Sequence, residues 1–253
     1  MKLNATTSIS TSKILLVPYS PHHVPQYHTW MQNPTLQKLT ASEPLSLEEE
    51  YAMQESWRED GDKLTFIACL PVKKEGEEEG NGGKGEGEKK VVQGGLDDED
   101  DGMIGDVNLF LSEDDEEEEN GPQNQRQQTK SVIGEIEIMV ATPSARGKGH
   151  GKAILITFLW YIIQNTSAIL LEYTKTADAT LRYLRVRIDA ENQTSISLFQ
   201  KVGFTKRSPT PNYFNEIELR LSPSDATLLF KEMQEPSIVL YELPAAVAKQ
   251  KAQ

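Results

Sequence analysis

Cysteine is almost absent from this 253-residue chain, which contains only Cys69. A single thiol excludes an internal disulfide framework and any zinc site built from several cysteines. Long apolar runs are absent too, so no transmembrane helix is predicted, and residues 1–20 lack the apolar centre of a signal peptide. We therefore expect a cytoplasmic protein, with the nucleus as an open alternative, and neither a membrane nor a nucleic-acid partner.

Positive charge is scarce as well, since 26 Lys and Arg residues face 39 Asp and Glu residues and leave a net charge of -13. Nearly all of this imbalance lies between Val72 and Lys130, where 7 basic residues face 19 acidic ones. Segments 72–101 and 113–130 are rich in like charge and short of apolar residues, so they cannot bury enough apolar area to fold. We predict two disordered acidic insertions within one domain over 12–222, and we favour solvated loops over a partner-binding role.

The rest of the chain alternates strand-like and helix-like segments. Buried strands are predicted over 13–20, 63–71, 102–112, 131–141, 184–190 and 215–222. Helices are predicted over 46–60, 152–164 and 194–203, the first with a capping box from Ser46 and Glu49. Residues 223–253 are expected to add one helix and a loose tail. Helices interspersed among strands indicate an α/β or α+β domain with six or seven strands.

A glycine-rich segment, Ser144–Lys152 with the sequence SARGKGHGK, stands between a predicted strand and a predicted helix. Glycines at a helix N-terminus expose backbone N–H groups and favour phosphate binding. A Walker A loop would require glycine at Arg146 and a hydroxyl at Ala153, and a dinucleotide fingerprint would require glycine at Lys152. Both motifs are therefore excluded.

The pattern Arg146-x-x-Gly149-x-Gly151 resembles the Gln/Arg-x-x-Gly-x-Gly/Ala motif of the Gcn5-related N-acetyltransferases, the GNAT superfamily. The resemblance implies the GNAT fold, with a mixed central sheet flanked by helices, and loop amides that hold the pyrophosphate of acetyl-coenzyme A. The alternative is a glycine-rich turn with a helix cap. The expected cofactor-binding residues are Val140, Arg146, Gly147, Lys148, Gly149, His150, Gly151, Lys152 and Asn192.

The later segment ENQTSISLFQKVGF, from Glu191 to Phe204, resembles a second signature of the same superfamily. The resemblance implies that Asn192 contacts the cofactor arm, whereas the residues alone also fit a capped helix. Several further segments, among them GDVNLFL and GEIEIMVATPSARGKGHG, are similar to the N-acetyltransferase 9-like branch. That similarity implies acetyl transfer from acetyl-coenzyme A to a protein amine, at an N-terminus or a lysine, with tubulin as the suggested partner.

Strand 131–141 carries the candidate catalytic residues. Strict alternation places Glu135 and Glu137 on one face, where burial and mutual repulsion would make either a general base. An ion pair with Arg185 or Arg187 is an equal alternative for each glutamate. Glu135 ranks slightly first, because relatives commonly carry a functional glutamate at its position.

Other residues receive less specific interpretations. A backbone N–H near Val140 is expected to face the thioester, as the superfamily's splayed strands imply. Many relatives place the proton-donating tyrosine where this chain has Phe199, so Tyr213, Tyr183 or water remain as donors. Cys69 is interpreted as an inert core thiol.

The three histidines of the N-terminal region, His22, His23 and His28, are interpreted as surface or loop residues, and no metal is expected. A different class of function stays open beside the enzyme. It is a non-catalytic or weakly catalytic protein of the same fold that binds a cytoskeletal partner.

Overall fold

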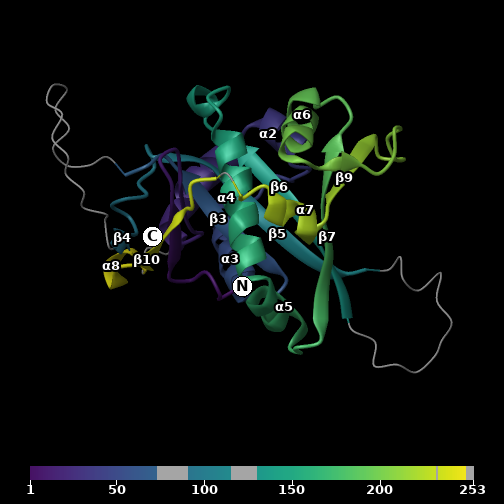
Figure 1. The fold of residues 1–253 in the computed structure, drawn as a ribbon. Helices are drawn as coiled ribbons and strands as arrows, with labels where there is room; N and C mark the ends of the chain where they lie inside the picture. The colour runs from purple at the N-terminus through teal and green to yellow at the C-terminus, as the bar shows by residue number, and fades with distance from the viewer. Residues whose placement is uncertain (73–90, 115–129, 232, 249–253) are drawn as a thin grey trace, which may run out of the picture.

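The computed structural model describes residues 1–72, 91–114, 130–231 and 233–248. Most of the two predicted acidic insertions, residues 73–90 and 115–129, lies outside the described residues. The described part contains one mixed sheet whose strands follow the spatial order β4-β10-β1-β2-β3-β5-β6-β7-β9-β8. The fold class is confirmed (Figure 1), although the sheet has ten strands instead of six or seven.

The strands are short at both edges of the sheet and long at its centre. Their bounds are β1 Thr7–Ser10, β2 Leu15–Pro18, β3 Lys63–Cys69, β4 Val91–Gln93, β5 Met103–Glu113, β6 Lys130–Val140, β7 Ala179–Asp189, β8 Thr205–Lys206, β9 Glu216–Leu221 and β10 Ser237–Glu242. Neighbouring strands pair antiparallel except β6 with β7 and β10 with β4, which pair parallel.

Helices and 3-10 turns connect the strands and cover the sheet. Their bounds are η1 Pro21–His23, α1 Val24–Met31, α2 Pro34–Leu39, α3 Leu47–Glu59, η3 Pro143–Ala145, α4 His150–Gln164, α5 Thr166–Thr174, α6 Gln193–Val202, α7 Pro223–Leu228 and α8 Ala245–Ala248. The predicted capping box of α3 is present, because Ser46 Oγ accepts from the Glu49 N–H and the Glu49 side chain accepts from the Ser46 N–H.

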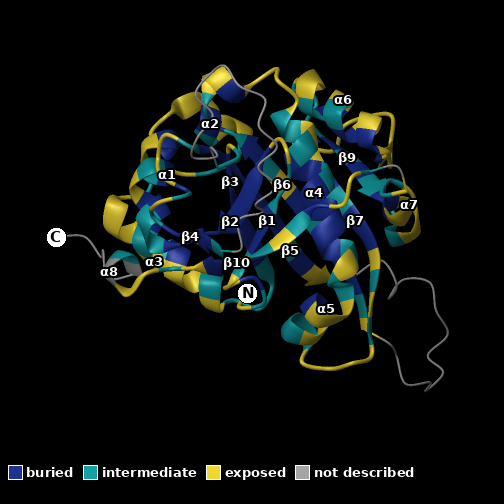
Figure 2. Cartoon of the chain, turned by 60° about the vertical axis from the view of Figure 1, so that its left-hand side comes forward, coloured by how far each residue is buried: buried dark blue, intermediate teal, exposed yellow. Residues whose placement is uncertain are grey.

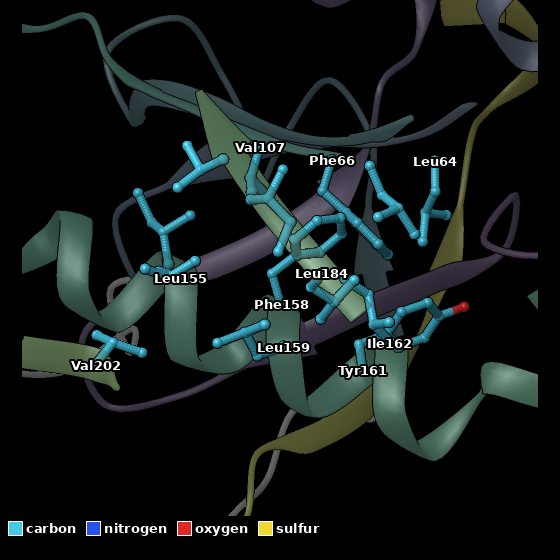
Figure 3. Packing of buried hydrophobic residues seen from close by; sticks show 14 of the residues in the cluster. Leu64, Phe66, Val107, Leu155, Phe158, Leu159, Tyr161, Ile162, Leu184 and Val202 are labelled. Carbon is cyan, nitrogen blue, oxygen red and sulfur yellow. The ribbon is translucent and has the colours of Figure 1, made fainter. Parts of the chain in front are cut away.

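Two apolar clusters cover the two faces of the sheet, as a period of two requires. On one face Leu64 and Phe66 of β3 pack with the apolar side of α4, whose Phe158 meets the Phe66 ring edge-on at 6.1 Å between centroids (Figure 3). On the other face Ile67 and Cys69 pack beneath α1 and α2. Buried residues therefore concentrate in the central strands and in α4 (Figure 2).

Among the described helices, none is by itself long and apolar enough to cross a bilayer. Only α4 and α5 together reach that length, and they meet at a bend of 72°.

The C-terminal expectation is wrong for residues 237–242. Instead of a loose tail they form β10, which pairs antiparallel with β1 and parallel with β4. The short helix α7 does follow the last predicted strand. A strand at this position was missed because its partners, residues 7–10 and 91–93, are remote in sequence and too short to be recognised as strands.

The expected disorder over 72–101 is wrong for residues 91–101, which contain β4 and a buried carboxylate, Asp98. The Asp98 oxygens lie 3.0 Å from the Nε2 atoms of both His22 and His23, and they accept from the Tyr241 hydroxyl at 2.8 Å and the Gly95 N–H at 2.6 Å. The interpretation of His22 and His23 as surface or loop residues is therefore wrong. Both lie in η1 and are linked through Asp98, in the segment after β4, to Tyr241 of β10.

Candidate active site

The site begins where β6 and β7 part. Their parallel pairing runs from Lys130 with Ala179 to Glu135 with Arg185 and then stops. Beyond this point Ile136–Val140 pair only with β5 among the described strands, and β7 continues against β9. The unpaired side of β6 over Ile136–Val140 is called the open edge below. The strand splay implied by the sequence resemblance is thus present.

Backbone groups of Val140 face the open edge. The next residue, Ala141, donates its N–H to Ile104 on the β5 side at 2.9 Å, and successive residues of a strand point in opposite directions. The Val140 carbonyl oxygen on the same side accepts from Arg146 Nε at 2.8 Å, and Arg146 Nη2 also donates to the Ala141 carbonyl. The Val140 N–H is therefore directed at the open edge. The exposed Arg146 side chain therefore binds the end of the strand.

The glycine loop turns directly from the strand end into α4. Gly147 and Gly149 have φ of 73° and 84°, in the left-handed region that other residues disfavour. Gly149 is the N-cap of α4, and no side chain within the described residues caps the helix. The N–H groups of the first turn, at His150, Gly151 and Lys152, consequently have no intrahelical partner. This is a loop that presents backbone donors.

Neighbouring segments close around this loop. A Cβ at Gly151 would lie 3.4 Å from Leu198 of α6 and 3.7 Å from Val140, so the glycine brings the helix, the strand end and α6 together. The Nδ1 of His150 lies 3.0 Å from the Ala145 carbonyl oxygen, while Lys148 and Lys152 are exposed.

Lys13 was missed by sequence reasoning. Its ammonium lies 3.5 Å from the point a Gly149 Cβ would occupy, so it adds positive charge to the loop. No local signal could have assigned this lysine to a loop 136 positions further along the chain.

Asn192 stands at the N-cap of α6, where its Oδ1 accepts from the Ser195 N–H at 3.1 Å. The capping alternative is therefore realised. Phe199 is 1% exposed and packs edge-on against Phe204, which makes it a core residue. Tyr213 is fully exposed and Tyr183 is buried beneath Arg220.

The two glutamates of β6 differ in their partners. Glu135 accepts from Arg185 Nε at 2.9 Å and from Arg187 through Nε at 2.9 Å and Nη2 at 2.8 Å. The ion-pair alternative is therefore realised for Glu135. Glu137 has no hydrogen bond or ion pair with any residue in the described ranges and reaches solvent.

Desolvation nevertheless raises the pKa of Glu137 to about 7. The protein atoms packed around this exposed side chain are the largest cause of the rise, the charges of Glu135 and Asp106 add to it, and Arg187 opposes it. A carboxyl group with a pKa near neutrality is suited to accept a proton at physiological pH. Glu137 is thus the better placed of the two candidate bases.

Asp106 and Asn108 of β5 lie on the same face and were missed. Asn108 is directly opposite Glu137, and Asp106 is opposite Met139. Asp106 is 2% exposed, and burial raises its pKa to about 7 against the weaker opposing effects of Asn108 and Tyr27. Two polar residues at alternate positions of an otherwise apolar strand were a signal that could have indicated them.

His22, His23 and Asp98 are the potential metal-binding group found among the described residues. The Ser20 N–H donates to His23 Nδ1, which leaves the proton on Nε2 and directs it at Asp98. The nitrogen and oxygen atoms that could bind a metal therefore form hydrogen bonds with one another.

Cys69 is fully buried, and burial raises the pKa of its thiol well above its usual value. It is an inert core thiol, as expected.

Comparison with known proteins agrees with this geometry. The model of the Acetyltransferase (GNAT) domain matches residues 13–205. Spermidine N-acetyltransferase of Vibrio cholerae, in complex with coenzyme A and spermine, superimposes with a TM-score of 0.53 over 86% of this chain and 99% of that one, at 15% identity. The structure of RimL, a ribosomal L7/L12 alpha-N-protein acetyltransferase, gives 0.54 over 87% and 99%, at 12% identity. The family model, which covers most of the chain, together with the shared fold therefore defines an N-acetyltransferase.

Relatives of known name show to which branch of the N-acetyltransferases the chain is most similar. An N-acetyltransferase 9-like protein of Schizosaccharomyces pombe is 36% identical over 231 residues, which cover 87% of this chain and 98% of the relative. The human Alpha/beta-tubulin-N-acetyltransferase 9 is 37% identical over 227 residues, which cover 89% and 88%. The chain belongs to the GNAT family, in its N-acetyltransferase 9-like branch.

Proposed function

We propose that this enzyme transfers an acetyl group from acetyl-coenzyme A to a primary amine of a protein, with a tubulin chain as the first candidate. The observation that carries the proposal is the uncapped glycine loop directly beside the open edge of β6. The tubulin assignment is supported by the names of the human and Drosophila melanogaster relatives, which are 37% identical to this chain. The cytoplasm remains the predicted location.

The loop has the properties that a diphosphate requires. Left-handed glycines and an uncapped helix N-terminus offer several N–H donors at close approach, and no side-chain atom lies within 4 Å of a Cβ built at Gly147. Lys13, Lys148 and Lys152 supply positive charge around it. We assign the diphosphate of acetyl-coenzyme A to the backbone of residues 146–152.

The open edge supplies the groups for acyl transfer. The N–H of Val140 is placed to donate to the thioester oxygen as negative charge develops there. Glu137 takes a proton from the amine, whose nitrogen attacks the carbonyl carbon. The C–S bond then breaks, and the leaving thiolate takes up the remaining proton that the nitrogen loses as the amide forms, directly or through water. Transfer is direct, since the Cys69 thiol is buried away from solvent.

A pair of isosteric variants tests the base. Glu137→Gln should lower kcat by roughly 10²- to 10⁴-fold, the usual contribution of a general base, and should leave the calorimetric affinity for coenzyme A unchanged. Glu113→Gln, an exposed carboxylate on β5, is the matched control and should behave as wild type. Equal rates for Glu137→Gln and wild type would refute the assignment of the base.

The same assay decides between catalysis and binding alone. Wild-type protein should acetylate peptides that carry the N-termini of tubulin chains. A protein that binds coenzyme A and acetylates neither these peptides nor lysine-containing ones would instead be the non-catalytic binding protein.

A further inference from the structure

Three polar side chains lie together on the face of the sheet that α1, α2 and α3 cover. Asn108 of β5 and Glu137 of β6 are direct cross-strand partners, so their Cβ atoms are about 5 Å apart. Asn108 Nδ2 donates to Asp106 Oδ2 at 2.7 Å. This contact joins Asp106 to the pair. Asp106, Asn108 and Glu137 are called the acidic triad below.

Two acceptor atoms of the acidic triad lack a donor, although the Asp106 carboxyl also interacts with Asn108 Nδ2 and with the Tyr27 hydroxyl. Asp106 Oδ1 and Asn108 Oδ1 are buried and have no hydrogen-bond partner among the described residues, although their side chains are only 2% and 4% exposed. The orientation of the Asn108 amide is fixed, because its Nδ2 must face the Asp106 carboxylate. Buried polar atoms are normally satisfied, so two such oxygens side by side indicate a missing donor.

The charge around the triad has the same sign. The Glu50 carboxyl of α3 is buried with Oε2 unpartnered, and burial raises its pKa to about 7. The charges of Asp106, Glu50 and Glu137 all act on the Tyr27 hydroxyl, which places the three carboxyls around one side chain of α1. Arg187, whose guanidinium already binds Glu135, is the cation that acts on Glu137. A cationic donor is therefore the complementary ligand.

The acidic triad also lies near the position assigned to the thioester. Glu137 belongs to the part of β6 that no longer pairs with β7, three residues before Val140, whose N–H faces the position assigned to the thioester. A group held by Glu137 is therefore close in the strand to that position.

We propose that Asp106, Asn108 and Glu137 bind the primary ammonium group of the acceptor, an inference that rests on the proposed function. Three N–H donors of R–NH₃⁺ match Asp106 Oδ1, Asn108 Oδ1 and one oxygen of the Glu137 carboxylate. One proton passes from the ammonium ion to Glu137 and on to solvent, which leaves a neutral amine for attack. The second proton is lost from the nitrogen as the amide forms and goes to the leaving thiolate. The ammonium group comes from a protein N-terminus or from a lysine side chain.

Binding is tested without turnover on the full-length protein loaded with coenzyme A. The thermal midpoint at pH 8 is measured with n-butylammonium chloride and, at equal ionic strength, with tetramethylammonium chloride, which has no N–H donor. Wild type and the control Glu113→Gln should be stabilised by n-butylammonium only. Asp106→Asn, which keeps the shape of the side chain, and Glu137→Gln should each weaken this binding at least tenfold. No selective effect of n-butylammonium on wild type would overturn the proposal.

Steady-state kinetics distinguish the two sources of the amine. One arm uses a lysine-free peptide with a free N-terminus, and the other uses an N-acetylated peptide with one lysine. Asp106→Asn should raise KM at least tenfold for whichever peptide is the substrate, with a smaller change in kcat. Acetylation of a peptide with an unchanged KM in Asp106→Asn would refute the ammonium site and leave the proposed function intact. Selective binding of n-butylammonium without acetylation would refute the function and leave the site intact.

Discussion

Replacing Asp106 by Asn should make the protein more stable at alkaline pH. The Asp106 carboxyl is 2% exposed, and burial raises its pKa from 3.8 to about 7. In the unfolded chain the group ionises near pH 4, whereas in the folded protein it holds its proton until about pH 7. The free energy of unfolding of wild type therefore falls as the pH rises from about 4 to 7 and is level above that.

The size of this effect follows from the shift. A rise from 3.8 to about 7 corresponds to about 4 kcal/mol at 1.36 kcal/mol per pKa unit, and this is the upper limit of the loss above pH 7. Asparagine removes the ionisation. The Oδ1 of the new asparagine still accepts from Asn108 Nδ2. Its NH₂ group takes the place of the unpartnered Oδ1 of Asp106 and costs about 1–3 kcal/mol if it stays without an acceptor. The variant should therefore be more stable than wild type by about 1–3 kcal/mol at pH 8 and less stable by about 1–3 kcal/mol at pH 4.

Urea denaturation followed by tryptophan fluorescence measures the difference at several pH values between 4 and 8.5. The neighbouring groups Glu50, Glu137 and Tyr27 are common to both proteins, so their titration largely cancels. Glu113→Gln, on the same strand but exposed, should show no such dependence on pH. A stability difference between Asp106→Asn and wild type that is constant from pH 4 to 8.5 would refute the reasoning.

Three further variants test the rest of the structure. Asp98→Asn should lower the free energy of unfolding by about 3 kcal/mol, because His22, His23 and Tyr241 lose a common charged acceptor, and an unchanged urea midpoint would contradict the role of Asp98. Gly149→Val should weaken coenzyme A binding at least tenfold in calorimetry, since a β-branched residue is strained at φ of 84°, and wild-type affinity would exclude the loop as the binding site. Phe158→Ala should cost about 3–5 kcal/mol in urea denaturation, whereas a loss below 1 kcal/mol would show that α4 is not a core helix.

Local signals sufficed for the centre of the fold. The strands around Ile67, Val107 and Ile136 are long and apolar, and α4 and α6 have helical periodicity and recognisable starts. Such features are encoded within ten or fifteen neighbouring residues. The glycine loop was predictable for the same reason, because the left-handed N-cap and the apolar helix that follows it are formed by consecutive residues.

Long-range pairing was not predictable in the same way. The segments of β1, β4 and β10 have four, three and six residues, and each becomes a strand only because the others lie beside it. Asp98 appears within an acidic run and differs from its neighbours only through partners 75, 76 and 143 positions away. A prediction from composition therefore placed Asp98, a buried carboxylate, in a solvated loop.

The candidate site shows the same division. Alternation placed Glu135 and Glu137 on one face but treated them as equivalent. The register of β6 against β7 separates them, because Arg185 is the direct partner of Glu135 and Arg187 is also within reach of its carboxylate. The pairing of the two strands ends before Glu137. A shift of two residues in that register would exchange the roles of the two glutamates, and no sequence pattern fixes such a shift.

The open edge explains why the acidic triad and the glycine loop lie where they do. Continued pairing of β6 with β7 would satisfy every backbone group of Val140, and the strand could then bind nothing at that edge. Arg146 satisfies the carbonyl oxygen alone, which stabilises the strand end and leaves the N–H for a ligand. The same interruption frees Glu137 from the arginines of β7, so that its carboxylate can receive a proton. Under the proposed function, loss of regular pairing over five residues supplies both the N–H donor to the thioester and the acceptor of the amine proton. A substitution that restored the pairing would remove both.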